Sequence, residues 1–152
     1  MGQKMKIKES TIVNCSVDDI WDILKDPGNM PAWNPKCHTC DAGKTISIGS
    51  SFDATFRLGS KEKKTSCRIM DLKPGEKITI RYSGEAFSTG DGFVDETFTL
   101  VYQGVRQTKL VLEVDFSQSE LPFLIKSIMW FLSRFGQKSG KSSLDGIRSI
   151  LE

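Results

Sequence analysis

The chain has 152 residues, of which 38% are hydrophobic and 26% charged, and its formal net charge is +2. Length and composition indicate one globular domain and argue against a disordered or membrane class. The densest cations, Lys61, Lys63 and Lys64, are interrupted by Glu62, so no basic face of the kind that binds nucleic acid is expected, and we predict no nucleic-acid partner.

The N-terminal stretch "MGQKMKIKES" has no apolar core of the kind that a secretory signal requires. We therefore expect a cytoplasmic protein. In that reducing compartment the four cysteines are expected as thiols. They are Cys15, Cys37, Cys40 and Cys67.

Residues 5–15 predict a strand that places Ile7, Thr11 and Val13 on one face. Ser16 is then a preferred helix N-cap, and Asp19 follows at the position of a capping box. The apolar residues after Ser16 have helical spacing and predict a short amphipathic helix: Val17, Ile20, Trp21 and Leu24. The segment "KDPGNMPAWNP" ends this helix, because its prolines and glycine disfavour a regular continuation.

Between residues 36 and 117 the apolar period changes to two, which predicts strands. Pro74 and Gly75 predict a tight turn, and "QGVRQT" predicts another. Short connections of this kind favour an antiparallel sheet. The predicted apolar faces are Phe52, Ala54, Phe56 and Leu58; Ile78, Ile80 and Tyr82; Val94, Glu96, Phe98, Leu100 and Tyr102; and Leu110, Leu112, Val114 and Phe116.

Helical spacing returns from Ser119 in a stripe formed by Leu121, Leu124, Ile125, Ile128, Leu132 and Phe135. Phe123, Met129, Trp130 and Phe131 widen this stripe beyond what one sheet face needs to cover. Lys126 and Arg134 keep the apolar run well short of about 18 residues, so we predict no transmembrane segment. Gly136, Gly140 and Gly146 weaken the rest of the helix, and a kink or fraying after Phe135 is expected.

The stretch "WNPKCHTCD" carries a C-x-x-C spacing. In a regular strand Cys37 and Cys40 point to opposite faces, with Cα atoms roughly 10 Å apart, whereas a disulfide needs less than about 7 Å. A structural zinc needs about four ligands, and His38, Cys15 and Cys67 form no second paired motif. A redox C-x-x-C belongs in a parallel βαβ unit, which the antiparallel pattern does not provide. We predict structural thiols, no metal and no cofactor.

The order of these elements resembles the helix-grip fold of the START-like (SRPBCC) superfamily. "VDDIWDILKDPGNMPAWNP" resembles a motif of its polyketide cyclase/dehydrase-like branch, and "ISIGSSF" resembles the entry to the following strand. The resemblance spans nearly the whole chain and implies a single α+β domain over residues 1–152. In that fold a curved antiparallel sheet wraps around a long C-terminal helix, with two short helices between the first two strands.

The resemblance also implies a mostly apolar cavity between the sheet and the C-terminal helix. We predict a hydrophobic small-molecule ligand of lipid, polyketide or isoprenoid type in that cavity. The predicted ligand-binding residues are Trp33, Phe56, Tyr82, Phe87, Glu96, Phe98, Leu112, Met129 and Leu132. The alternative for the excess apolar surface of the C-terminal helix is core packing plus a homodimer contact through Trp130 or Phe131.

Glu96 interrupts an otherwise apolar strand face and is the one candidate for a catalytic residue. Either it lies at a solvated rim, because the strand begins there or a bulge shifts the phase, or it points into the cavity. A buried carboxyl group has a raised pKa and can act as general acid or base.

Other residues have plainer interpretations. Trp33 and Tyr82 are either pocket residues or core aromatics with a bonded polar tip. His38 is expected on the surface of a strand. Arg68 is ambiguous, because either Met70 and Leu72 or Cys67 and Ile69 can form the apolar face beside it. The loop "SGEAFSTGDGF", with Phe87 at its centre, suits a mobile gate.

Three functions follow from the sequence. The first is a binding module that sequesters or carries an apolar ligand. The second is an enzyme of the cyclase or dehydratase kind that uses Glu96 in the same cavity. The third is a protein-interaction domain that acts through the C-terminal helix.

Overall fold

The structure is a computed structural model that describes residues 6–34, 36–43, 45–58, 61–84, 92–118 and 143–151. Its strands are β1 (Lys6–Val13), β2 (Cys37–Cys40), β3 (Ser51–Leu58), β4 (Lys61–Lys73), β5 (Lys77–Ser83), β6 (Val94–Gly104) and β7 (Gln107–Asp115). Its helices are α1 (Val17–Leu24), the short 3₁₀ helix η1 (Pro27–Asn29), α2 (Met30–Trp33) and α4 (Ser143–Leu151).

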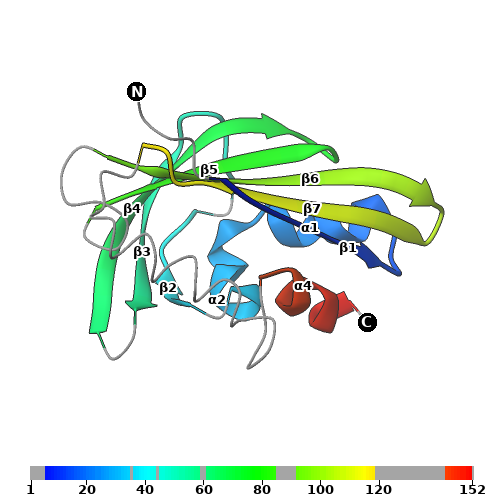
Figure 1. Cartoon of the computed structure of the whole chain (residues 1–152), viewed down its shortest axis with the longest axis horizontal. Coiled ribbons are helices and arrows are strands. Elements are labelled where there is room, and N and C mark those ends of the chain that lie inside the picture. Colours follow the sequence, from blue (N-terminus) through cyan, green and yellow to red (C-terminus); the bar gives the residue numbers. More distant parts are fainter. Residues whose placement is uncertain are drawn as a thin grey trace.

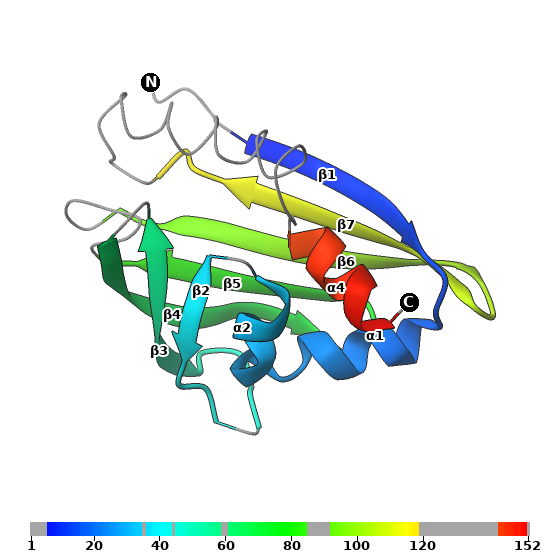
Figure 2. The same ribbon diagram turned by 90° about the horizontal axis from the view of Figure 1, so that it is seen from below.

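The strands form one antiparallel seven-stranded sheet in the order β1-β7-β6-β5-β4-β3-β2. Strands β2 to β7 follow one another as a meander, and β1 adds to the outer edge of β7. The sheet is curved, and α1, α2 and α4 lie on its concave side (Figures 1 and 2). This is the helix-grip fold that the sequence predicts.

Alternation along each strand places apolar side chains on the concave side, where they meet across neighbouring strands. Phe98 on β6 lies opposite Ile78 on β5 and Leu112 on β7, and all three are buried. The same alternation makes Ile78, Ile80 and Tyr82 a buried row on β5, as their spacing predicts. The core of the domain therefore lies between this face of the sheet and the helices.

Helix α1 begins where the sequence predicts. The backbone N–H of Asp19 donates to the Ser16 hydroxyl at 3.2 Å, so Ser16 is the N-cap. Ile20 and Leu24 are buried, and Val17 and Trp21 pack beside them. Pro27 and Gly28 do not abolish helical structure but restrict it to η1 and the single turn of α2.

The β4–β5 connection is the predicted tight turn. The N–H of Glu76 donates to the Lys73 carbonyl at 2.9 Å, and Gly75 has a φ of 75°, a left-handed conformation that glycine adopts without strain. Pro74 supplies the fixed φ that the preceding turn position favours.

Tyr102 does not continue the buried face of β6, contrary to the sequence prediction. Leu100 is buried, but Tyr102 is 66% exposed. The pairing of β6 with β7 is irregular between Tyr102 and Gly104, and this end of the hairpin extends beyond the other elements in both views (Figures 1 and 2).

Gly146 allows α4 to lie against α2. A Cβ atom at this position would be 2.0 Å from the carbonyl oxygen of Trp33, a distance that no real contact allows. From the sequence, Gly146 is expected to weaken the helix, whereas in the structure it allows α4 to pack closely against α2. The predicted helical stripe from Leu121 to Phe135, and the expected kink after Phe135, lie outside the described residues.

Candidate functional site

The concave face of the sheet is apolar except for a few polar groups. Its buried residues on β3 to β7 are Phe52, Ala54, Phe56, Thr65, Cys67, Ile69, Ile78, Ile80, Tyr82, Val94, Glu96, Phe98, Leu100, Thr108, Leu110 and Leu112. Four of the predicted ligand-binding residues besides Glu96 are therefore buried on this face. They are Phe56, Tyr82, Phe98 and Leu112.

Glu96 is buried, with 7% of its surface exposed. It lies opposite Ile80 on β5 and Val114 on β7 within regular pairing, so neither a strand end nor a bulge explains its position. The carboxyl group points to the concave side of the sheet.

The Tyr82 hydroxyl donates to Oε1 of Glu96 at 2.7 Å and lies 3.6 Å from Sδ of Met30 on α2. Burial raises the pKa of Glu96 to about 7, although the Tyr82 hydrogen bond and the positive charge of Lys36 act to lower it. Burial, followed by the adjacent Glu96 charge, raises the pKa of Tyr82 well above its ordinary value. Near neutral pH, Tyr82 is therefore a donor, and Glu96 is able both to accept and to release a proton.

Lys36 also belongs to this site, although no sequence pattern predicts it. Burial lowers the pKa of its amine, while the charges of Glu96 and Glu9 act to raise it. Its backbone is fixed on both sides, because its N–H donates to Oδ1 of Asn34 at 3.0 Å and its carbonyl accepts from the N–H of Arg57 at 2.8 Å. The only sequence signal is its place in "WNPKC", directly before a buried cysteine.

Aromatic contacts hold the walls around the Glu96–Tyr82 pair. The Trp33 ring meets the Phe98 ring edge to face, with centroids 5.3 Å apart, and Phe56 meets Tyr82 in the same manner at 5.5 Å. Two buried polar atoms, Nε1 of Trp33 and Oγ1 of Thr65, have no hydrogen-bond partner in the described part of the chain. Such groups are rare in folded proteins and call for an explanation.

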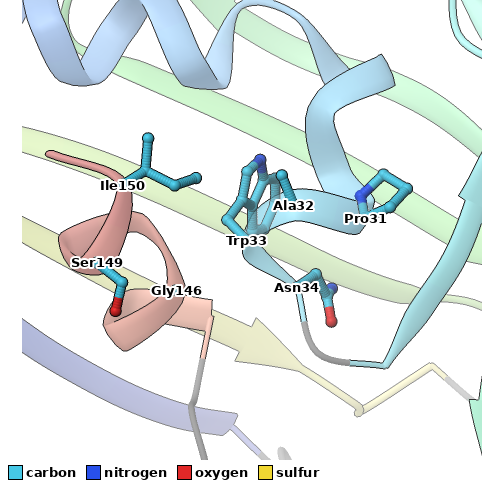
Figure 3. Close-up of a pocket in the computed structure, with 7 residues that line it drawn as sticks. All are labelled: Pro31, Ala32, Trp33, Asn34, Gly146, Ser149 and Ile150. Carbon is cyan, nitrogen blue, oxygen red and sulfur yellow. The ribbon is translucent and has the colours of Figure 1, made fainter.

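A pocket of about 310 Å³ lies between α2 and α4. Figure 3 shows its lining, formed by Pro31, Ala32, Trp33, Asn34, Gly146, Ser149 and Ile150. Trp33 is the predicted ligand-binding residue that borders it. This residue thus connects the pocket between the helices with the aromatic wall against Phe98.

The two thiols of the C-x-x-C stretch do not point to opposite faces, and that prediction is wrong. Pairing of β2 with β3 shifts between Cys37 and Thr39, so Cys37 lies opposite Phe56 and Cys40 lies opposite Ala54. Both partners belong to the concave face, so the two thiols lie on the same side of β2. His38 is an extra residue in β2 with no partner on β3. It shifts the alternation by one position, and this shift brings Cys37 and Cys40 to the same face.

All four cysteines are free thiols. Burial raises the pKa of Cys37 to about 12 and that of Cys40 to about 11, and it raises the pKa of Cys67 further. Thiols of this kind are poor nucleophiles, because the reactive species is the thiolate. Among the residues that the structure describes, no group of three or more His, Cys, Asp or Glu side chains could hold a metal ion.

Some of the remaining sequence predictions fall on described residues, and others do not. His38 is exposed and lies 3.5 Å from Glu62, and Arg68 is exposed because Cys67 and Ile69 form the buried face of β4. Phe87, Met129 and Leu132 lie outside the described residues, as do Trp130 and Phe131. No helix in the described ranges is long and apolar enough to cross a membrane.

Residues 4–152 match the family model described as polyketide cyclase / dehydrase and lipid transport. The chain belongs to this family. A direct search of curated proteins finds no match. The family description names both a catalytic and a carrier activity, and a chain of this family therefore binds a hydrophobic ligand or acts as a cyclase.

Solved structures confirm the fold at low sequence identity. The ZhuI aromatase/cyclase from Streptomyces sp. R1128 superposes with a TM-score of 0.76 and 14% identity, covering 98% of this chain and 94% of that one. A START superfamily protein from Mycobacterium smegmatis superposes with a TM-score of 0.71 and 17% identity, covering 97% of this chain and 99% of that one. A third structure is a point mutant of norcoclaurine synthase from Thalictrum flavum in complex with a transition-state analogue. It superposes with a TM-score of 0.70 and 15% identity, covering 99% of this chain and 96% of that one.

Proposed function

We propose that this protein binds a hydrophobic small molecule of lipid, polyketide or isoprenoid type against the concave face of its sheet. The observation that carries this proposal is a buried ionisable pair, Tyr82 and Glu96, in surroundings that are otherwise apolar. A buried carboxyl group costs folding free energy, and ionisable groups with pKa values shifted by burial are concentrated at functional sites. A ligand with an apolar body and one polar group gives this carboxyl group a use.

The two unpartnered buried groups support the same proposal. Nε1 of Trp33 is a donor, and Oγ1 of Thr65 is able to donate and accept. Together with Glu96 they would recognise a molecule that carries at least one carbonyl or hydroxyl oxygen. A pure hydrocarbon would leave Nε1 of Trp33 and Oγ1 of Thr65 without a partner, so we favour an oxygenated ligand.

Native mass spectrometry of the purified protein, followed by solvent extraction, tests this proposal. We expect an apolar molecule to be released, and an apolar fluorescent probe to bind the emptied protein. Glu96→Gln should alter the pH dependence of probe affinity, whereas Glu113→Gln, at the partly exposed ion pair with Lys6, should not. A protein that carries no ligand and has no affinity for such probes contradicts the proposal.

A second candidate is an enzyme of the cyclase or dehydratase kind. It is favoured by Glu96, whose pKa of about 7 suits a group that exchanges protons at neutral pH. In a dehydration the Glu96 carboxylate would take the proton from the carbon next to a carbonyl, and the acid so formed would return it to the departing hydroxyl as water. Glu96→Gln should then lower turnover by about 10²- to 10⁴-fold while the probe still binds.

Predictions from the sequence alone accompany these proposals. We retain a cytoplasmic location, the absence of a nucleic-acid partner and a homodimer contact through Trp130 or Phe131 as predictions. Size-exclusion chromatography with Trp130→Ala tests the dimer contact.

A further inference from the structure

The tip of the β6–β7 hairpin exposes apolar side chains next to positive charges. Tyr102 is 66% exposed and Val105 is 78% exposed, and Arg106 follows Val105 in the turn. We call Tyr102, Val105 and Arg106 the hairpin tip. These residues are not required for the core, so their composition is free to serve another purpose.

A second row of residues lies beside the hairpin tip on the outer face of the sheet, opposite to the face of Tyr102, because Val101 and Lys109 alternate with Tyr102 and Thr108. Lys109 on β7 lies opposite Ile12 on β1 and opposite Val101 on β6, so one cation stands between two apolar side chains. Ile12 and Val101 are each 39% exposed. Apolar side chains are therefore exposed on both faces of the sheet near the hairpin tip, and on the outer face a cation lies between two of them.

The charge of this segment has one sign. Residues 101–112 contain Arg106 and Lys109 and no Asp or Glu. The hairpin also extends further along the long axis of the molecule than the neighbouring β1, α1 and α4 (Figures 1 and 2). A flat surface can thus approach the hairpin tip without first meeting those elements.

We propose that the hairpin tip docks on the surface of an anionic lipid bilayer. Tyrosine is favoured at the boundary between headgroups and acyl chains, and a valine in a turn can enter that boundary. Arg106 and Lys109 then meet the anionic headgroups. The apolar area consists of few side chains, which suits a weak and reversible contact with a membrane. This inference does not depend on which ligand the domain binds.

Flotation of the full chain with vesicles tests the proposal. Vesicles of phosphatidylcholine with about one-third phosphatidylserine should bind the protein, and binding should weaken as salt is added. Vesicles of phosphatidylcholine alone should bind it less. Arg106→Gln should weaken binding to the anionic vesicles by about fivefold, as expected for one cation near such a surface. The matched control is Lys64→Gln, an exposed cation on β4, which should leave binding unchanged.

The apolar part of the hairpin tip has its own control. Val105→Ser with Tyr102→Ser should weaken binding by at least about fivefold. Ile48→Ser removes an apolar side chain that is 63% exposed outside the hairpin, and it should have no effect. Circular dichroism verifies that each variant is folded.

Two results would overturn the proposal. One is the absence of binding to anionic vesicles at low salt, or binding that the hairpin variants share equally with the wild type. The other is a protein that binds no vesicles but shows, in analytical ultracentrifugation, a monomer–dimer equilibrium that Val105→Ser shifts. That result would make the hairpin tip a contact between copies of this chain.

Discussion

The Tyr82 hydroxyl and the Glu96 carboxyl group form a hydrogen bond of 2.7 Å between adjacent strands, on the buried side of the sheet. The bond favours the carboxylate, because a hydroxyl donor stabilises a negative charge. Burial disfavours the carboxylate more strongly, and the pKa of Glu96 settles at about 7. The ionisation of one side chain is thereby tied to the stability of the domain.

Glu96→Gln should remove a pH dependence of stability. The pKa of Glu96 is raised from its ordinary value of 4.5, so the folded protein binds this proton more tightly than the unfolded chain does. Below about pH 4.5 both states are protonated and the group has no effect. Above about pH 7 the folded state contains a buried carboxylate, and the free energy of unfolding is lower by roughly 3 kcal/mol. The free energy of unfolding of Glu96→Gln should not fall in this way, because glutamine does not ionise.

Urea denaturation of the wild type and Glu96→Gln at about pH 5 and about pH 8 measures the effect. The stability of the variant relative to the wild type should increase between these two conditions. Parallel changes in the two proteins would mean that Glu96 does not titrate in this range.

Tyr82→Phe should raise the pKa of Glu96 further, because it removes the hydrogen bond that lowers it. It should also destabilise the domain by about 1–3 kcal/mol, since a buried carboxyl oxygen loses its donor. Carbon-13 NMR of the labelled carboxyl group follows the titration directly. Tyr102→Phe is the control, because this exposed tyrosine should leave the Glu96 titration unchanged. A titration that Tyr82→Phe does not move would refute the coupling.

Gly146→Ala should destabilise the protein although alanine favours helix. The gain in helix propensity is about 1 kcal/mol, whereas the new Cβ would be 2.0 Å from the Trp33 carbonyl oxygen and would force α4 away from α2. We expect a net loss of about 1–3 kcal/mol in the free energy of unfolding. Ser149→Ala, an exposed change on the same helix, should stay within about 0.5 kcal/mol of the wild type. A Gly146→Ala protein as stable as this control would contradict the close contact.

The thiols of the folded protein should resist alkylation. With pKa values of about 12 for Cys37 and about 11 for Cys40, the thiolate is scarce at about pH 8. Labelling with iodoacetamide, followed by mass mapping, measures this. We expect the half-buried Cys40 to react slowly, and the buried Cys37 and Cys67 to react more slowly still. Denatured protein should react at all four cysteines. Rapid labelling of Cys37 in the folded state would show that the β2 strand opens.

The sequence predicts most of the fold because its local signals agree with one another. The Ser16 cap, the Pro74–Gly75 turn and the period of two in β5 each specify a local conformation that the tertiary structure retains. The alternation also places Tyr82 and Glu96 on the same side of neighbouring strands. It does not show that they bond, because that depends on the register between the strands.

Other features depend on distances that no local pattern contains. The shift between Cys37 and Thr39 turns two thiols to one side, and the sequence "CHTC" carries no signal for such an irregularity. Lys36 approaches Glu96 only because the chain folds back after α2. Gly146 has a role in packing that becomes visible only when Trp33 is in place. In each case the cause is a contact between segments that lie apart in the chain.

The position of β1 at the edge of β7 has a consequence for biosynthesis. Lys6 leaves the ribosome early, yet its partner, Asp115, is made only after the whole meander. We therefore expect β1 to pair only after β7 is available, with its apolar residues Ile7 and Val13 exposed to other chains until then. Pairing β1 with β7 closes a loop that spans the whole meander, and contacts between residues so far apart in the chain slow folding more than local hairpins do.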